Sequence, residues 1–174
     1  SRLRWTNTVL IAASLLYTSC DLIEPEFDNV LDIQNNDPPA LLFSPKEYTA
    51  STGEEVAVDL YALEVENVAA LQAQILYDKD RLEIVSIGPG TFFDSSDSPL
   101  FVTDSSNPGR LDLYSVFLGS RKEVSGTGDL ATIVFRVIAA GDAYLEVSGD
   151  SELLNRDSQP IALKSLGIGV IRAQ

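Results

Sequence analysis

The chain has 174 residues, enough for one ordinary domain with its own hydrophobic core and too few for two large ones. It carries 26 acidic and 12 basic residues, a formal net charge of −14, and this surplus of negative charge disfavours nucleic acid and anionic lipid head groups as partners. It contains no histidine and one cysteine, which excludes Ser-His-Asp and Cys-His catalysis, histidine-ligated zinc and an internal disulfide.

The first predicted element is an apolar segment over residues 1–20. Arg2 and Arg4 precede a run without charge over residues 5–20, as the positive and apolar regions of a secretory signal do. That run would span roughly 24 Å as a helix, a little less than a bilayer core. We expect a membrane anchor or a lipoprotein signal that holds the rest of the chain outside the cytoplasm of a bacterium, on the periplasmic side or the cell surface. The expected anchor residues are Trp5, Val9, Leu10, Ile11, Leu15, Leu16 and Tyr17.

The end of this segment, Tyr17-Thr18-Ser19-Cys20, resembles the lipobox of bacterial lipoproteins, in which the cysteine is acylated and becomes the new N-terminus. Thr18 and Ser19 fit the small positions of that pattern, whereas Tyr17 departs from its aliphatic preference. If the segment is processed, Cys20 is the lipidation site. If it is not, Cys20 is a free thiol at the end of an apolar helix.

Residues 21–39 are expected to form an extended acidic tether. They contain six acidic residues, three prolines and no base, and no helical or strand period persists in them. The alternative is a segment that becomes ordered against a partner, because several side chains are more apolar than a spacer requires. These are Phe27, Val30, Leu31 and Ile33.

From residue 40 onward the pattern changes to short strands separated by turn sequences such as SNPG and SGTGD. Apolar and polar residues alternate in these strands, and no stretch shows a helical stripe. The pattern predicts an all-β fold over residues 40–174, an antiparallel sandwich of jelly-roll or immunoglobulin-like type with about nine strands. The predicted strands are residues 41–43, 56–65, 71–77, 82–87, 100–103, 111–118, 130–137, 143–147 and 166–172.

Two stretches resemble the cohesin family. ALQAQILYDKDRLEIVSIGPG (70–90) is similar to that family's strand, Tyr-Asp turn, Leu-led strand and glycine, and SGTGDLATIVFRVIAAGDAYLEV (125–147) to its Gly-rich turn, Leu-Ala-x-Ile-x-Phe-x-Val strand and hairpin. GEEVAVDLYALEVENVAALQ (53–72) fits the preceding strand and loop. The resemblance covers most of residues 40–172. It implies a nine-stranded jelly-roll sandwich that binds a dockerin, a small calcium-binding helical domain.

A candidate interaction face follows from alternation, because the contact surface of that family is one sheet face and no short motif. Gln72 and Gln74 are predicted to point away from the core, and Asp112 and Tyr114 to face solvent on their strand. A flat face of this composition suits protein recognition, in which aromatic anchors supply much of the binding energy. The alternative is a merely solvated face with one exposed tyrosine.

Acidic clusters are the remaining candidate sites. Each could supply oxygen ligands to a structural Ca²⁺, but none has the spacing of a dedicated calcium loop, and turn-forming aspartates explain them better. No cofactor and no catalytic site is expected. The clusters are Asp78 with Asp80, Asp94 with Asp97, and Asp150 with Glu152 and Asp157.

The sequence therefore predicts a non-catalytic, membrane-anchored protein–protein interaction module. The first hypothesis is an accessory or scaffolding subunit of a larger membrane complex, for example respiratory or photosynthetic, because the small residues of the anchor allow close helix packing. The first alternative is a cohesin-type docking module that recruits a dockerin-bearing protein to the cell envelope. The second is a carbohydrate-binding envelope lipoprotein, which would need an exposed aromatic platform.

Overall fold

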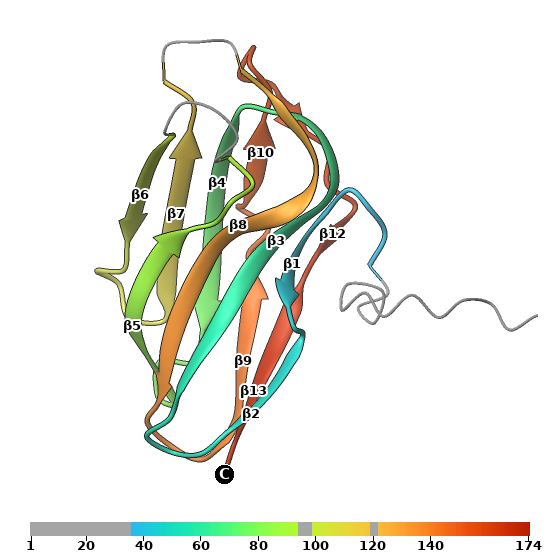
Figure 1. Ribbon diagram of the computed structural model, residues 1–174. Coiled ribbons are helices and arrows are strands. Elements are labelled where there is room, and N and C mark those ends of the chain that lie inside the picture. The colour runs from blue at the N-terminus through green and yellow to red at the C-terminus, as the bar shows by residue number, and fades with distance from the viewer. Residues whose placement is uncertain (1–35, 94–98, 119–121) are drawn as a thin grey trace, which may run out of the picture.

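The computed structural model describes residues 36–93, 99–118 and 122–174. Within these residues every regular element is a strand, and the thirteen strands form two sheets that stack face to face (Figure 1). The alternation of the sequence predicts such a sandwich, and the structure confirms it.

One sheet has five strands, with the long antiparallel pair β3 and β8 near its middle. Strand β5 pairs with β8, and β1 lies between β3 and the short β12. In order across the sheet the strands are β12 (Ser165–Leu166), β1 (Ala40–Ser44), β3 (Glu55–Val68), β8 (Val124–Val137) and β5 (Leu82–Pro89).

The other sheet has eight strands around β4. One edge of β4 pairs with β7, which also pairs with β6, and the other edge pairs first with β10 and then with β9. Strand β11 follows β10, and β13 and β2 continue the sheet beyond β9. The bounds are β2 (Glu47–Ala50), β4 (Ala70–Tyr77), β6 (Leu100–Asp104), β7 (Arg110–Val116), β9 (Gly141–Val147), β10 (Glu152–Leu154), β11 (Pro160–Ile161) and β13 (Ile168–Ala173).

The core lies between the sheets because alternate residues of each strand point inward. In β9, for example, Ala143, Leu145 and Val147 are buried while the residues between them are exposed. Three phenylalanines close one end of the core by edge-to-face ring contacts with centroids 5.3 Å apart. They are Phe92, Phe93 and Phe117.

Towards the end of β3 the regular pairing with β8 is interrupted by register shifts. Glu64 and Asn67 have φ angles of 46° and 57°, in the left-handed region that few residues other than glycine adopt. Their N–H groups are paired: that of Glu64 donates to Thr127 Oγ1 at 3.0 Å and that of Asn67 to Ser125 Oγ at 2.9 Å. The two strands curl here over the edge of the sandwich (Figure 1).

All nine predicted strands are present, some longer or shorter than expected, and four short ones are added: β2, β10, β11 and β12. These have four, three, two and two residues, too few for an alternating pattern to show in the sequence. Pairing is antiparallel apart from the pairs β1–β12 and β2–β13, which are parallel. The short strands extend the sheets at their margins and leave the predicted architecture unchanged.

None of the described residues belongs to a helix long and apolar enough to cross a bilayer. The anchor expected over residues 1–20, including Cys20, lies outside the described residues, as does the tether up to residue 35. The membrane segment and the lipidation site therefore stay predictions.

Candidate interaction face

The outward side of strands β6, β7, β4, β9 and β13 forms a broad surface, which we call the eight-strand face. The pairing of β4 with β7 sets Gln72 opposite Tyr114, and Gln74 opposite Asp112. Residues opposite each other on neighbouring strands point to the same side of a sheet. The four residues therefore lie together near the middle of this face, as two adjacent cross-strand pairs.

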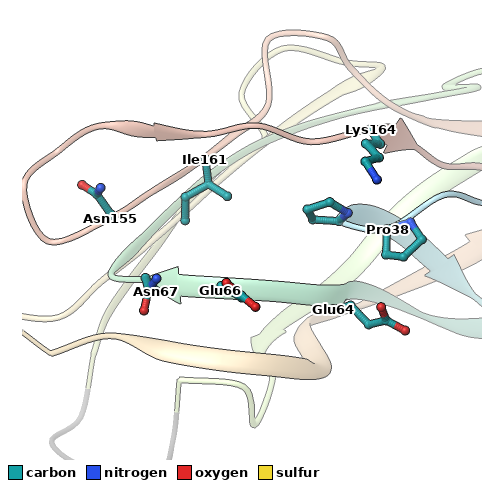
Figure 2. A pocket seen from close by; sticks show the side chains of 8 residues that line it. Pro38, Glu64, Glu66, Asn67, Asn155, Ile161 and Lys164 are labelled. Atoms are coloured by element: carbon teal, nitrogen blue, oxygen red, sulfur yellow. The ribbon is translucent and has the colours of Figure 1, made fainter.

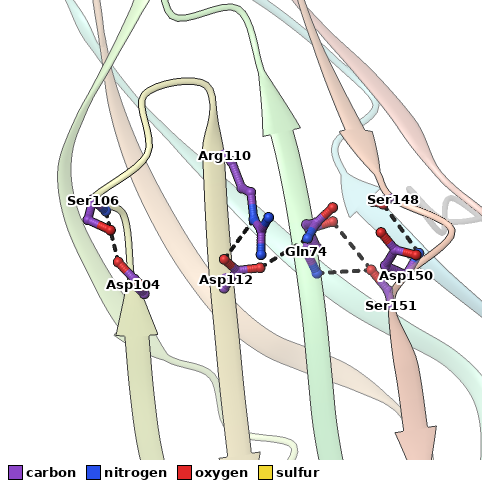
Figure 3. Close-up of polar contacts among 8 residues, drawn as sticks. All are labelled: Gln74, Asp104, Ser106, Arg110, Asp112, Ser148, Asp150 and Ser151. Atoms are coloured by element: carbon purple, nitrogen blue, oxygen red, sulfur yellow. Dashed lines mark hydrogen bonds and ion pairs between the residues drawn. The ribbon is translucent and has the colours of Figure 1, made fainter.

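Asp112 lies on the eight-strand face but is only 7% exposed, because its neighbours cover it. One carboxylate oxygen accepts a hydrogen bond from Arg110 Nε at 2.8 Å and the other from Gln74 Nε2 at 3.2 Å (Figure 3). The hydrogen bond to Asp112 also raises the pKa of the Arg110 guanidinium. Since both oxygens are used within the sheet, Asp112 orients Gln74 and Arg110 and is not itself offered to a partner.

Gln74 is held where β4 changes its partner from β10 to β9. The loop between those strands closes the gap: the Gln74 N–H donates to Ser151 Oγ at 3.0 Å, and the Gln74 carbonyl accepts the Ser148 N–H at 2.8 Å. Within the loop the Asp150 N–H donates to Ser148 Oγ at 3.2 Å (Figure 3). The backbone at Gln74 is thus fully paired, which fixes the position of its side chain on the face.

Exposed apolar side chains gather on the eight-strand face. Of the nine large apolar side chains that are exposed among the described residues, six lie on it: Leu76, Leu100, Val102, Tyr114, Tyr144 and Ile168. Val102 lies opposite Tyr114, and Leu100 is the next outward residue of β6. We call Leu100, Val102 and Tyr114 the Tyr114 patch. A contiguous exposed patch rimmed by polar groups is typical of an interaction site.

Acidic side chains border this patch. Asp104 lies opposite Asp112, and Glu152 lies opposite Gln72. Hydrogen bonds from Ser106 lower the pKa of Asp104, so its carboxylate is ionised at neutral pH (Figure 3). Within the described part of the chain neither Asp104 nor Glu152 forms a salt bridge. The rim of the Tyr114 patch is therefore negatively charged.

The outward side of the five-stranded sheet differs from the eight-strand face in the pairing of its acids and in its exposed apolar side chains. Arg136 pairs there with Glu55 at 2.7 Å and with Glu83 at 3.5 Å, so these two acids have a basic partner within the sheet. Its exposed apolar side chains do not form a comparable cluster, and Val85 in β5 is the large one exposed there. The eight-strand face is the better candidate for contact with another protein.

A groove of about 540 Å³ lies where the curled end of β3 approaches the loop after β10 (Figure 2). Its lining offers carboxylates and an ammonium group but no aromatic ring, so it lacks a flat surface on which a sugar could stack. The sequence did not predict it, because it depends on the bulges in β3. The lining residues are Pro38, Pro39, Glu64, Glu66, Asn67, Asn155, Ile161 and Lys164.

Residues 43–159, from β1 to the loop after β10, match the family model of the cohesin domain. The chain belongs to the cohesin family. The match includes β4 and β7, the strands that carry the four central residues of the eight-strand face, and it confirms the resemblance seen in the sequence. Cohesins are protein–protein docking modules, and a docking role follows for this chain from its family.

Solved structures share the fold of this cohesin. The sixth cohesin of scaffoldin B from Acetivibrio cellulolyticus, in complex with a mutant Cel5 dockerin, has a TM-score of 0.66 at 18% identity over 78% of this chain and 98% of that one. A non-cellulosomal cohesin from the archaeon Archaeoglobus fulgidus has a TM-score of 0.65 at 17% identity over 78% and 90%. The seventh ScaB type I cohesin from Pseudobacteroides cellulosolvens has a TM-score of 0.62 at 20% identity over 78% and 91%. No curated protein sequence matches this cohesin.

The acidic clusters considered as calcium ligands lie in or beside turns of the cohesin. Asp78 accepts hydrogen bonds from Arg81 Nη1 at 2.7 Å and from the Asp80 N–H at 3.0 Å, so its carboxylate stabilises the turn after β4. No three potential ligands gather around one point in the described part of the chain, and Asp94 and Asp97 lie outside it. The third cluster is divided between β10 and its flanking loops: Asp150, Glu152 and Asp157.

Sequence reasoning missed several residues of the eight-strand face in this cohesin, namely Leu76, Leu100, Val102, Arg110, Tyr144 and Ile168. Alternation within each strand was enough to set most of them outward. The missing information was the order of strands across the sheet, which decides whether two outward residues share a face.

Proposed function

We propose that this cohesin recruits a dockerin-bearing protein, and that it binds the dockerin through the eight-strand face with the Tyr114 patch at the centre. The observation that carries the proposal is the concentration of exposed apolar side chains within an acidic rim on this one face. The Acetivibrio cellulolyticus cohesin of the same fold, in complex with a dockerin, supports a dockerin as the partner.

Each central residue has a role in this proposal. Tyr114 is held by the sheet and is 39% exposed, so it offers ring area at a low cost in conformational entropy. Gln74 and Arg110 supply hydrogen-bond donors whose directions are set by Asp112. Gln72, opposite Tyr114, is exposed and offers an amide beside the ring.

The second part of the proposal concerns location. We propose that residues 1–20 hold the module at a bacterial membrane, outside the cytoplasm, as a helix or through an acylated Cys20, with residues 21–39 as the spacer. The Arg-led apolar run and the lipobox-like sequence support this. Family membership favours recruitment of a dockerin over the accessory-subunit and carbohydrate-binding hypotheses, since neither has an observation of its own in the structure.

The test is capture of dockerins by the full chain in mild detergent. A display library of dockerin modules from bacterial and archaeal genomes is sorted against the chain, and the affinities of the selected dockerins are measured. Tyr114→Ala is expected to weaken binding by about tenfold, since loss of a central aromatic anchor costs more than about 1 kcal/mol. The matched control is Val85→Ala, because Val85 is equally exposed at 39% but lies on the other sheet.

Binding that survives Tyr114→Ala unchanged would remove the Tyr114 patch from the contact. A library from which the chain selects no dockerin would contradict the proposed partner itself. Equal losses for Tyr114→Ala and Val85→Ala would show that the variants act through the fold and not through the face.

A further inference from the structure

Two apolar side chains are fully buried on the side of the five-stranded sheet that does not face the core. The register of β1 with β3 sets Ala40 opposite Leu63 and Leu42 opposite Tyr61. All four point outward, because the residues that alternate with them belong to the core between the sheets. Ala40 and Leu42 nevertheless have no exposed surface, and they form a small apolar cluster of their own with Tyr61 and Leu63. We call these four residues the β1 cluster.

The β1 cluster lies where no described strand covers the sheet. All strands of the described residues belong to the two sheets of the sandwich, and the outer side of the five-stranded sheet faces the viewer in Figure 1. Tyr61 and Leu63 are themselves only partly buried, and they stand beside the two buried side chains, since side chains project from a sheet roughly in parallel. Burial raises the pKa of the Tyr61 phenol above its ordinary value, with a smaller contribution from the charge of Asp129. An apolar layer from outside the described residues is therefore required over this part of the sheet.

The segment that leads into β1 carries side chains of the right kind. Pro39, the residue before β1, is held in place because its carbonyl accepts the Lys164 N–H at 2.8 Å. Ile33 precedes Pro39 by six residues, a reach of up to about 20 Å, whereas Leu42 follows Pro39 by three residues of chain, about 10 Å. The segment is thus long enough to fold back over the β1 cluster. Its apolar residues are Phe27, Val30, Leu31 and Ile33.

The charges at the two ends of β1 suit an acidic segment. Every arginine among the described residues forms a salt bridge, whereas Lys46 and Lys164 form none with a described residue. Lys46 follows β1 by two residues, and the Lys164 side chain extends towards Pro38, where the chain enters the fold (Figure 2). Asp28 and Asp32 stand among the apolar residues of the segment, which contains no base. The segment can therefore place a carboxylate near a lysine while its apolar side chains lie on the sheet.

We propose that residues 27–33 fold back over the outer side of β1 and β3 and bury the β1 cluster beneath their apolar side chains. The free part of the spacer is then residues 21–26. This contact lies on the sheet opposite the eight-strand face, so it leaves that face open and does not depend on the identity of the partner. It also orients the module, because the five-stranded sheet is held towards the spacer and the eight-strand face away from it.

Photo-cross-linking of the full chain in mild detergent locates the cover. Tyr61 is replaced by p-benzoylphenylalanine, and mass spectrometry of the digested chain is expected to find its cross-links in residues 27–33. The matched control is the same replacement of Tyr144, an exposed tyrosine of the other sheet. Its yield should be at least about fivefold lower, because a segment with a preferred site has a higher effective concentration there.

Substitutions in the segment test the contact from its other side. Leu31→Asp combined with Ile33→Asp places charges where apolar side chains are proposed to be buried. Cross-linking from position 61 should then fall at least about fivefold, and the midpoint of thermal unfolding should drop by about 4 °C or more. Asn29→Asp combined with Gln34→Asp is the matched control, because it adds the same charges at polar positions and should change neither quantity.

The charge contact is tested separately. Lys46→Glu combined with Lys164→Glu should lower the cross-linking yield from position 61, because both lysines then repel the acidic segment. The matched control is Lys79→Glu, which reverses the charge of a lysine in the turn after β4 and should leave the yield unchanged. If all three lysine substitutions leave the yield unchanged, the charge contact is overturned and the apolar cover stands.

The remaining outcomes decide the proposal as a whole. Cross-links from position 61 to another part of the chain, or none, would overturn it, and so would equal yields from the two tyrosine positions. A cross-linked dimer would identify a second copy of the chain as the cover and overturn it as well. Unchanged yield and midpoint after Leu31→Asp with Ile33→Asp would exclude residues 27–33. Capture of dockerins, measured in parallel, reports on the proposed function separately.

Discussion

Asp112 accepts hydrogen bonds from two side chains that come from different strands, Gln74 on β4 and Arg110 on β7. It thereby holds an amide and a guanidinium in fixed directions on a surface where long side chains would otherwise change rotamer freely. In the proposed docking, Asp112 contributes to recognition through these two neighbours. It also contributes to stability, because its two donors would lose their shared acceptor without it.

Replacing this acceptor tests its structural contribution. Asp112→Ala is expected to lower the free energy of unfolding by about 1–3 kcal/mol, since a largely buried hydrogen-bonding group and its two bonds are lost. Urea denaturation of the full chain measures the change. Glu66→Ala, which removes an exposed carboxylate, should change the same quantity by less than about 0.5 kcal/mol. If the two variants have the same free energy of unfolding, the hydrogen bonds of Asp112 do not stabilise the fold.

At the scale of elements, the end of β5 depends on the absence of a side chain. The Gly90 N–H donates to the Leu130 carbonyl at 2.9 Å, and a Cβ atom at Gly90 would lie 2.2 Å from the backbone oxygen of Asp129. The Asp129 carboxylate then accepts the Thr91 N–H at 3.0 Å. The backbone that follows β5 is therefore in direct contact with the backbone of β8.

This close approach predicts that an alanine substitution lowers the free energy of unfolding much more at Gly90 than at Gly88. Gly90→Ala is expected to lower the free energy of unfolding by at least about 1–3 kcal/mol, because backbone must move to admit the methyl group. Gly88→Ala is the control: no atom lies within 4 Å of a Cβ atom there, so the change should stay within about 0.5 kcal/mol. Thermal or urea unfolding of both variants compares them, and similar midpoints would contradict the proposed contact between β5 and β8.

The long elements could be predicted from the sequence because each carries its own alternation, as residues 56–65 of β3 and 71–77 of β4 show. The short strands could not, because Glu152–Leu154 and Pro160–Ile161 become strands only by pairing with β4 and with each other. Intrinsic preference does not decide such segments; their tertiary neighbours do.

The candidate face, too, could be predicted only in part, because its arrangement depends on tertiary pairing. Alternation set Gln72 and Tyr114 outward, but only the register makes them neighbours. The burial of Asp112 depends on the reach of the Arg110 side chain, and the place of Tyr144 beside β4 depends on the strand order. Neither has a local signal in the sequence.

Across the whole molecule, the charges are distributed unevenly in a way that matches the proposed location. The chain has a formal charge of −14, while its first twenty residues carry only the two arginines. An apolar, basic leader and an acidic body fit a protein that is held at a bilayer while its body projects from the anionic surface.

Fractionation of bacterial cells that express the full chain tests this arrangement. The chain is expected in the membrane fraction, with its body digested by protease added from outside the cytoplasm. Leu15→Arg combined with Leu16→Arg should abolish membrane association, because charges in the apolar run oppose its insertion. Intact-mass analysis of the membrane-bound chain separates the two modes: a helical anchor keeps Ser1 as the first residue, and an acyl anchor leaves an acylated Cys20 as the first residue. Recovery of the unaltered chain from the cytosol would contradict the proposed location.

Strand β1 has a mechanical consequence for such an arrangement. It is the first strand after residues 36–39, its five residues are buried, and it is flanked on both sides, by β3 over its whole length and by β12 at its start. A pull along this strand loads the ladder of hydrogen bonds to β3 in shear, so the bonds resist together and do not open one after another. In the proposed arrangement, tension between a membrane-held N-terminal segment and a captured protein would be resisted by this ladder of hydrogen bonds.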